Sequence, residues 1–332
     1  MSARRADGAG QGRTALPGGA WVPAVHPLRH GLHDTVLYCS LHDPATSCPP
    51  GHITNKKAVQ PDLYQSMADG ETWQINTSRK RVRKSVDRTL AHLDECLLLH
   101  HKTQELSGVE VFGVVEGGDV LEERVRSARE TAKRPVGGFC LDGLHTAAME
   151  QHLRTQLITA IIKELPEDKP RLLQGVGRPD EVLACVEAGV DLFESFFPFQ
   201  VTERGFVELD KSEADVGQKN GTDNPQEDQT KMTPFEINLK DKRYRDDFSP
   251  LVEGCGCYCC RNHQRAYLHH LLVTNELLAG VLLMLHNTAH YCAFFTALRG
   301  ALASNRLDHL KKRVLEGRGK GVNREGAGEK DG

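Results

Sequence analysis

Short β-rich runs alternate with amphipathic stretches through the middle of the chain. Runs of apolar and β-branched residues predict strands, and the segments between them place apolar residues at helical spacing. The predicted strands lie at 109–115, from 137, and at 170–176 and 190–196, and the predicted helices at 78–99, 120–133, 147–165 and 178–188. Repeated βα units predict a parallel sheet, and both an open doubly wound sheet and a closed barrel fit this alternation.

The C-terminal part of the chain changes to consecutive helices. Residues 265–285 contain no proline and have leucines and a valine at helical spacing, so they predict one helix, with His286 at its end. Two further helices are predicted at 287–302 and 306–315. This part therefore forms a helical subdomain that is distinct from the βα repeat.

Three segments lack any hydrophobic period. Residues 1–34 and 317–332 predict disordered tails, and 206–232 predicts a polar disordered insertion. The stretch 41–63 has four prolines and reads as a loop. The remaining boundaries place a barrel-like βα domain at 35–205 and 233–250, and the helical subdomain at 251–316.

Bulk composition narrows the functional classes. The 332 residues carry a net charge of -3, so no general affinity for polyanions is expected, and any nucleic-acid contact must come from a local patch or a partner. The basic front of the helix at 78–99 is such a patch, although a basic helix face is more often only solvated. The longest apolar run, Leu277–Leu285, is too short to span a bilayer, so we expect no transmembrane segment, with peripheral membrane association left open.

Cysteine usage points to a metal site. Ten cysteines without a hydrophobic leader indicate a reducing cytosolic setting, where clustered cysteines bind metals more often than they form disulfides. Cys255, Cys257 and Cys260 form a C-x-C-x2-C pattern, and His286 follows after a helix length. Three thiolates and one imidazole make a closed tetrahedral Zn2+ shell, which is typical of a structural site.

Other assignments of this cluster stay open from the sequence. The cysteines could be buried thiols or disulfides, but four cysteines within six residues are poorly placed for unstrained mutual bridges. Cys259 could replace Cys260 as a ligand. The rival imidazoles are His263, His269 and His270, and the last two are expected to pack or form hydrogen bonds on the helix.

The segment from Cys255 to Asn287 resembles the zinc-binding region of the tRNA-guanine transglycosylases. The shared pattern comprises the three cysteines, then R-A-Y-L-H-H-L from Arg265, then His286-Asn287, and the likeness extends from about 37 to 302. The resemblance implies a (β/α)8-barrel-like fold with one structural zinc per subunit. Because fewer βα units precede 248 than such barrels need, we expect a barrel that could be incomplete at its N-terminus.

The resemblance also locates the family's chemistry, and this chain departs from it. Glu194 stands at the nucleophile position where the family has aspartate, and Glu116 replaces a base-reading glutamine. Asp142-Gly143 stands where the family has a glycine pair, and Asp69 is a weak match for a base-reading aspartate. Pro198-Phe199-Gln200 replaces P-T-R, and the D-S-G-G segment that carries the other catalytic aspartate is absent from the sequence. These departures predict a degenerate, non-catalytic site.

Taken together, the resemblance implies a non-catalytic subunit. Such a subunit forms a heterodimer with a catalytic paralogue that exchanges guanine for queuine at the wobble position of tRNAs with GUN anticodons, and it supports tRNA positioning. The surface around 267–295, including Tyr291, Phe294 and Phe295, is expected to be interfacial. Cytoplasmic localisation, with peripheral association at the mitochondrial outer membrane, is expected. The rivals are an active transglycosylase that uses Glu194 and a zinc-stabilised interaction protein with no tRNA role.

Overall fold

The computed structural model describes residues 38–39, 49–69, 77–144, 149–208 and 236–319. Contacts divide the chain into two compact units. The first comprises the residues up to 176 together with 184–194, and the second comprises 177–183 and the residues from 195 onward. Each unit is described by itself.

The first unit is built on a parallel sheet whose strands follow one another in space as they do in the chain. The strands are β1 (Tyr38–Cys39), β2 (Leu63–Gln65), β3 (Glu110–Val115), β4 (Gly138–Leu141), β5 (Arg171–Gln174) and β6 (Leu192–Glu194). Each pairs in parallel with the next, in the order β1-β2-β3-β4-β5-β6. A doubly wound sheet reverses its strand order at a switch point, whereas a barrel winds in one direction. The order therefore identifies barrel-type winding.

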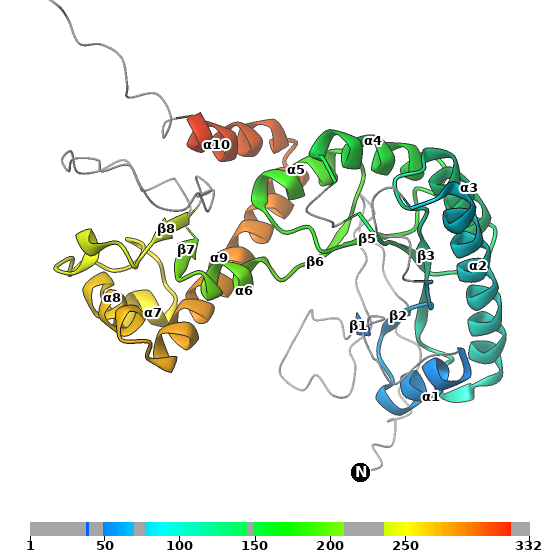
Figure 1. Ribbon diagram of the computed structural model, residues 1–332, viewed down its shortest axis with the longest axis horizontal. Helices are drawn as coiled ribbons and strands as arrows, with labels where there is room; N and C mark the ends of the chain where they lie inside the picture. The colour runs from blue at the N-terminus through cyan, green and yellow to red at the C-terminus, as the bar shows by residue number, and fades with distance from the viewer. Residues whose placement is uncertain (1–37, 40–48, 70–76, 145–148, 209–235, 320–332) are drawn as a thin grey trace, which may run out of the picture. The chain divides into compact units, whose positions relative to one another are not determined.

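Helices cover the outer face of this sheet. They are α1 (Pro49–Val59), α2 (Arg79–Lys102), a short 3-10 turn (Gln104–Leu106), α3 (Leu121–Ala132), α4 (Gln151–Ile162) and the end of α5 (Pro179–Glu187), of which the residues from 184 belong to this unit. Figure 1 shows α2, α3 and α4 along one side of the strands. Alternate strand residues, such as Tyr64, Phe139 and Leu173, join buried helix residues such as Leu93 and Ile158 in the main core. Successive side chains along each strand point to opposite faces of the sheet, which separates this outer core from the inner face.

The inner face shows how strongly the sheet curls. Gln174 Nε2 of β5 donates a hydrogen bond to Gln65 Oε1 of β2 at 2.8 Å. Two strands lie between β2 and β5, and three strand spacings in a flat sheet would separate them by about 14 Å. The amides meet because the sheet bends around a small interior cluster of Leu63, Phe112, Val114, Cys140 and Leu172. The barrel-like fold is confirmed: within the described part of the chain this sheet has six strands, and β1 does not pair with β6.

The segment predicted as a loop at 41–63 was assigned wrongly in its second half. Residues 49–59 form α1 and 63–65 form β2. Pro49 and Pro50 open the helix, where a missing N–H costs nothing and the fixed φ favours the first turn. Pro49 and Pro50, which had indicated a loop, therefore mark the start of a helix. Residues 41–48 lie outside the described part of the chain.

The second unit is mainly helical. Its elements are α6 (Phe197–Glu203), the antiparallel pair β7 (Phe206–Glu208) and β8 (Glu236–Asn238), a 3-10 turn (Lys242–Tyr244), α7 (Tyr258–Asn262), α8 (Arg265–Val273), α9 (Leu277–Ala303) and α10 (Leu307–Gly319). Leu239, Leu251, Leu268 and Leu283 lie among the residues of its core. The strand β7 occupies the first residues of the stretch 206–232 expected to be an insertion, and 209–235 lies outside the described residues.

The helices of the second unit differ from the prediction in their boundaries. The single helix expected at 265–285 is broken at Thr274–Glu276, where Asn275 has a φ of 56°. Asparagine tolerates this left-handed conformation, which commonly ends helices. The chain then enters α9, a 27-residue helix that merges the remainder with the helix expected at 287–302. His286 therefore lies within a long helix and not at its end.

One described helix, α9, is long and apolar enough to cross a membrane when judged by length and composition alone. The run 277–285 considered in the sequence is only its first third. The helix nevertheless holds polar groups in the interior of the second unit, because His286 and Asn287 are fully buried. Asn287 Nδ2 donates to Thr202 Oγ1 of α6 at 2.9 Å.

Candidate metal centre and strand-end carboxylates

Four side chains of the second unit converge on one point. The His286 Nδ1 atom lies 3.9 Å from Cys255 Sγ, 3.4 Å from Cys257 Sγ and 3.3 Å from Cys260 Sγ. All four candidate ligand atoms lie within 4.8 Å of one another. In a tetrahedral zinc site, Zn–S bonds of about 2.3 Å and Zn–N bonds of about 2.0 Å place S and N roughly 3.5 Å apart. The donor set and its spacing therefore fit a tetrahedral metal ion.

Local structure explains why these three cysteines point together. Cys257 caps the N-terminus of α7, and its Sγ accepts the N–H of Cys260 at 3.4 Å. One helical turn then brings the Cys260 thiol beside the Cys257 thiol. Cys259, one residue earlier, is fully buried in the hydrophobic core and is not part of the cluster. The alternative that Cys259 replaces Cys260 does not fit this geometry.

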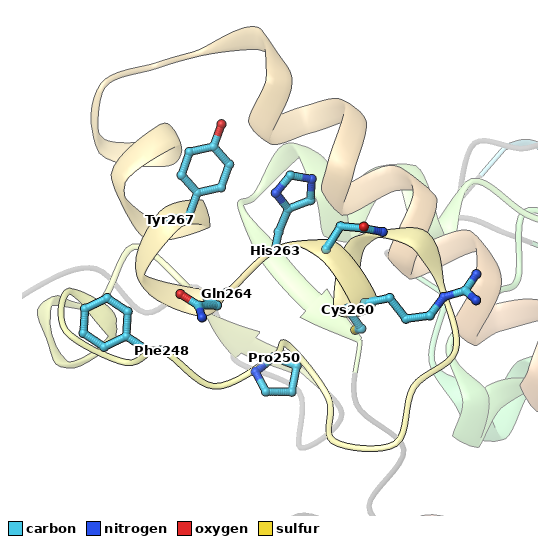
Figure 2. A pocket seen from close by; sticks show the side chains of 8 residues that line it. Phe248, Pro250, Cys260, His263, Gln264 and Tyr267 are labelled. Carbon is cyan, nitrogen blue, oxygen red and sulfur yellow. The ribbon is translucent and has the colours of Figure 1, made fainter.

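The rival histidines have other contacts. His269 Nδ1 forms a hydrogen bond with the Leu239 carbonyl at 2.8 Å, so it packs in the core as expected. His263 stacks on Tyr267 with ring centroids 5.3 Å apart, and Figure 2 shows the two rings side by side. His270 is exposed. None of the three joins the four-residue cluster.

Burial favours the protonated form of the thiols in this cluster. Burial is the main cause that raises the pKa of Cys260 well above its ordinary value, and burial also raises the pKa of Cys255. The four cysteines between 255 and 260 are all unbridged, which argues against the disulfide alternative there. Since a thiolate and not a thiol binds the metal, loading must displace protons from this site.

The segment leading into the cluster is held by Arg265. Its Nη1 donates to Asp247 Oδ2 at 3.1 Å, and its Nη2 donates to the Leu251 carbonyl at 2.9 Å. A pocket of about 540 Å³ lies beside this segment (Figure 2). It is lined by Phe248, Pro250, Cys260, Arg261, Asn262, His263, Gln264 and Tyr267. The arginine thus fixes the approach of the chain to the first cysteine.

The candidate carboxylates of the first unit gather at one edge of its sheet. Glu116 follows β3, Asp142 follows β4, and Glu194 is the last residue of β6. Because the strands are parallel, their carboxyl ends share an edge, which is where barrel enzymes place their sites. The three positions chosen from the sequence therefore lie at one edge of the sheet. The three side chains differ in direction and in partners.

Glu116 points back toward the helix layer. It is buried, and its Oε1 accepts hydrogen bonds from Ser85 Oγ at 3.0 Å and from Thr89 Oγ1, both on α2. Ser85 Oγ also lies 3.0 Å from the Asp69 carbonyl, and the Asp69 N–H donates to Thr89 Oγ1 at 2.9 Å. Glu116 and the Asp69 backbone thus belong to one buried network. This network ties α2 to the end of β3.

Asp142 and Gly143 form a tight turn. Asp142 Oδ1 accepts the N–H of Gly143 at 2.7 Å, and Gly143 has a φ of 70°. Behind the turn, the fully buried Arg124 donates to the carbonyls of Asp142 at 2.6 Å and Val115 at 3.2 Å. Burial lowers the pKa of Arg124 to about 10, with nearby carboxylates opposing, so it stays charged at neutral pH. Arg124 braces two strand ends, and nothing in the sequence pattern distinguished it.

Glu194 faces the concave side of the sheet. Gln174 Nε2 donates to its Oε2 at 2.7 Å while also bonding Gln65. The sequence pattern did not distinguish Gln65 or Gln174. Each is the last residue of its strand, β2 and β5 respectively, and faces the interior of the curled sheet. They fill the interior beside Glu194 with amide groups, so this carboxylate is held within the polar layer of the curled sheet.

Comparison with known proteins agrees with this architecture. A family model described as queuine tRNA-ribosyltransferase matches residues 40–320. A Danio rerio protein named queuine tRNA-ribosyltransferase accessory subunit 2 is 63% identical over 328 residues, which cover 87% of this chain and 79% of the relative. Proteins of the same name from Gallus gallus and Homo sapiens are 54% and 52% identical, each over 86% of this chain and 77% and 78% of the relative.

The family match spans both units, from the residue after β1 through the last helix. It includes the cysteine cluster with His286 and the strand-end positions Glu116, Asp142 and Glu194. The chain therefore belongs to the queuine tRNA-ribosyltransferase family, the tRNA-guanine transglycosylases.

Proposed function

We propose that this chain is the non-catalytic subunit of a heteromeric queuine tRNA-ribosyltransferase. In this proposal it pairs with a catalytic paralogue that exchanges guanine for queuine at the wobble position of tRNAs with GUN anticodons, and it helps to bind and position the tRNA. The relatives that carry the name accessory subunit support this role. The observation that carries it is the state of Glu116, which is buried and bound by two hydroxyls of α2.

The contacts of the carboxylates at the strand ends also support the proposal that this site no longer recognises a base. A base-reading group must direct donors and acceptors toward a ligand. Glu116 is committed to the helix layer, and Asp142 closes its own turn on Gly143. Glu194 stands where the family has aspartate, and its extra methylene displaces the carboxylate from the position that an attack requires. These groups stabilise the fold of the first unit.

The metal in this proposal is one structural Zn2+ held by Cys255, Cys257, Cys260 and His286. A complete shell of four protein ligands leaves no position for water or substrate, so the ion supplies stability and no chemistry. It joins the segment around α7 to the middle of α9. The surface formed by α8 and α9 therefore depends on the metal.

That surface is where we place the catalytic paralogue. Large apolar side chains are exposed at the beginning of α9 and the end of α8, namely Val273, Leu277, Leu278, Val281, Met284 and Leu285. Leu277 is 90% exposed. The sequence instead emphasised Tyr291, Phe294 and Phe295, which are only partly exposed. Tyr291 packs on Phe197 and donates its hydroxyl to the Gly177 carbonyl at 3.0 Å, so the first turns of α9 are the better docking residues.

Cytoplasmic localisation with peripheral association at the mitochondrial outer membrane is part of the proposal. Reducing surroundings suit a three-thiolate site. The exposed apolar turns of α9 would be covered by the paralogue in the complex, which leaves no exposed apolar stripe there for a bilayer. Fractionation of cells that express both subunits should place the chain in the soluble or carbonate-extractable fraction. Resistance to carbonate extraction would overturn the peripheral assignment.

A base-exchange assay tests the proposed role directly. Each subunit is assayed alone and in the mixture for incorporation of labelled queuine or guanine into tRNA. We expect this chain to be inactive alone, the mixture to be active, and Glu194→Ala in this chain to leave the mixture unchanged. Loss of activity in the mixture with Glu194→Ala would refute the proposal.

One rival function has a specific observation in its favour. Glu194 faces the concave side of the sheet and is oriented by Gln174, so a carboxylate is still present at the strand end that carries the family's nucleophile. If Glu194 attacks the ribose, the purified chain alone should form a covalent adduct with tRNA that is stable to denaturation. Absence of the adduct under conditions where the paralogue forms one supports the accessory role.

A further inference from the structure

The first two and a half turns of α2 carry a dense cationic surface. Residues 79–88 contain six cations and one acid, in a chain whose net charge is -3. All six cations are exposed. They are Arg79, Lys80, Arg81, Arg83, Lys84 and Arg88. The first turn contains no acidic residue, although the positive end of a helix dipole favours acids there.

Ion pairs with neighbouring elements account for only part of this charge. Arg88 Nη2 lies 2.5 Å from Asp69 Oδ2, so Arg88 is paired. Asp87, the one acid in the segment, is held by Arg126 of α3 at 2.8 Å and therefore does not offset the cations beside it. For Arg79, Lys80, Arg83 and Lys84, no ion pair is found among the residues that the structure describes. We call these four residues the α2 cationic patch.

The position of the patch in the fold gives the second argument. Ser85 and Thr89, which follow it on α2, bond to Glu116 at the carboxyl end of β3. The patch therefore lies at the carboxyl edge of the sheet, on the same side as the Asp142 turn and Glu194. Ligands of barrel-type sheets bind at this edge. An uncompensated cationic surface at this edge indicates an anionic partner.

The chemistry of the patch favours a phosphodiester backbone. Lysine and arginine on one helix face bind successive phosphates without reading bases. A membrane-binding helix would also expose apolar residues for insertion, but Val82 and Val86 are fully buried. A protein interface would be expected to centre on exposed apolar or aromatic anchors, and residues 79–88 expose none.

We propose that the α2 cationic patch binds the phosphate backbone of RNA and contributes directly to tRNA docking by this subunit. The proposal rests on the tRNA role proposed above and assigns part of it to four residues. It places an RNA contact on the first unit, far along the chain from the metal cluster. The contact is electrostatic, so it contributes affinity and orientation without sequence preference.

The test compares the salt dependence of RNA binding between variants. The full chain in complex with the catalytic paralogue is titrated against a fluorescently labelled GUN-anticodon tRNA transcript between about 50 and 200 mM salt. The variant Arg79→Gln, Lys80→Gln, Arg83→Gln, Lys84→Gln should reduce the slope of log Kobs against log salt by about 2.8 to 3.6, at roughly 0.7 to 0.9 for each of four phosphate contacts. Its Kd at low salt should rise about tenfold or more.

A second variant removes the same charges elsewhere. Arg306→Gln, Lys311→Gln, Lys312→Gln, Arg313→Gln changes two arginines and two lysines on α10 or immediately before it, so its net charge matches that of the patch variant. It should keep the wild-type slope. A charge-retaining variant, Arg79→Lys, Lys80→Arg, Arg83→Lys, Lys84→Arg, should also keep it. Circular dichroism of each variant confirms that α2 remains folded.

The outcomes separate this inference from the proposed function. If the patch and α10 variants lose the same affinity, binding follows net charge and the inference is wrong. If the patch variant binds tRNA like wild type but loses binding to phosphatidylserine vesicles or to an acidic peptide, the partner class is wrong. If the wild-type complex binds tRNA no better than the paralogue alone, the tRNA role itself fails and the inference fails with it.

Discussion

Removal of one metal ligand should unfold the second unit, and the effect can be sized from the cluster geometry. Cys257→Ala deletes one of four donors and also the sulfur that accepts the Cys260 N–H. Binding of structural zinc contributes about 10–16 kcal/mol to folding in small zinc domains. Whole domains are stable by only about 5–15 kcal/mol. Loss of tight binding therefore removes as much free energy as the second unit has available.

The adjacent Cys259 supplies the matched control for this prediction. It is fully buried in the same core but is not a ligand, so Cys259→Ala should lose only a packing contribution of about 1–2 kcal/mol and should keep the metal. Metal content of the purified proteins, thermal melting and limited proteolysis of residues 236–319 measure the difference. The reasoning is refuted if Cys257→Ala retains one equivalent of zinc and melts like Cys259→Ala, or if Cys259→Ala is the variant that loses the ion.

Three further predictions concern individual carboxylates. Glu194→Ala should leave exchange by the mixed complex unchanged within about twofold, since Glu194 is assigned no chemical step; a kinetic assay with saturating tRNA checks this. Glu116→Ala should destabilise the first unit by about 1–3 kcal/mol, because it leaves the buried Thr89 hydroxyl without its acceptor while Ser85 Oγ keeps the Asp69 carbonyl. Glu116→Gln should cost less than half as much, and denaturant melts that rank the two variants equally would contradict the network. Burial alone would raise the pKa of Asp247, but hydrogen bonds from Ser249 and Arg265 hold this pKa below its ordinary value. The second unit should therefore lose stability as the pH falls below about 4. Acid unfolding experiments should show that Asp247→Asn abolishes this loss.

Local patterns in the sequence were sufficient for the strands and for the cluster of ligands. β3, β5 and β6 appear within the predicted runs because buried parallel strands are short and continuously apolar. The cysteine spacing predicted which side chains converge, because a helical turn places Cys260 beside Cys257. Both features depend on residues that are near one another in the chain.

Features that depend on distant residues were not predictable. The Gln65–Gln174 hydrogen bond joins residues 109 positions apart and exists only because the sheet curls. The inward turn of Glu116 depends on hydroxyls of α2, and an exposed, base-reading orientation was equally compatible with the sequence. The break at Asn275 was missed because an asparagine inside an apolar helical pattern is a weak signal compared with glycine or proline.

The order of the metal ligands along the chain has a consequence for biosynthesis. The histidine follows the last cysteine by 26 residues, so the three thiols leave the ribosome before their fourth partner exists. During that interval the nascent chain presents an open three-sulfur site, which soft ions such as Cu(I) occupy readily and which oxidants reach. If the cluster holds Zn2+ as proposed, correct maturation depends on the zinc supply and the redox state at the moment when α9 is translated.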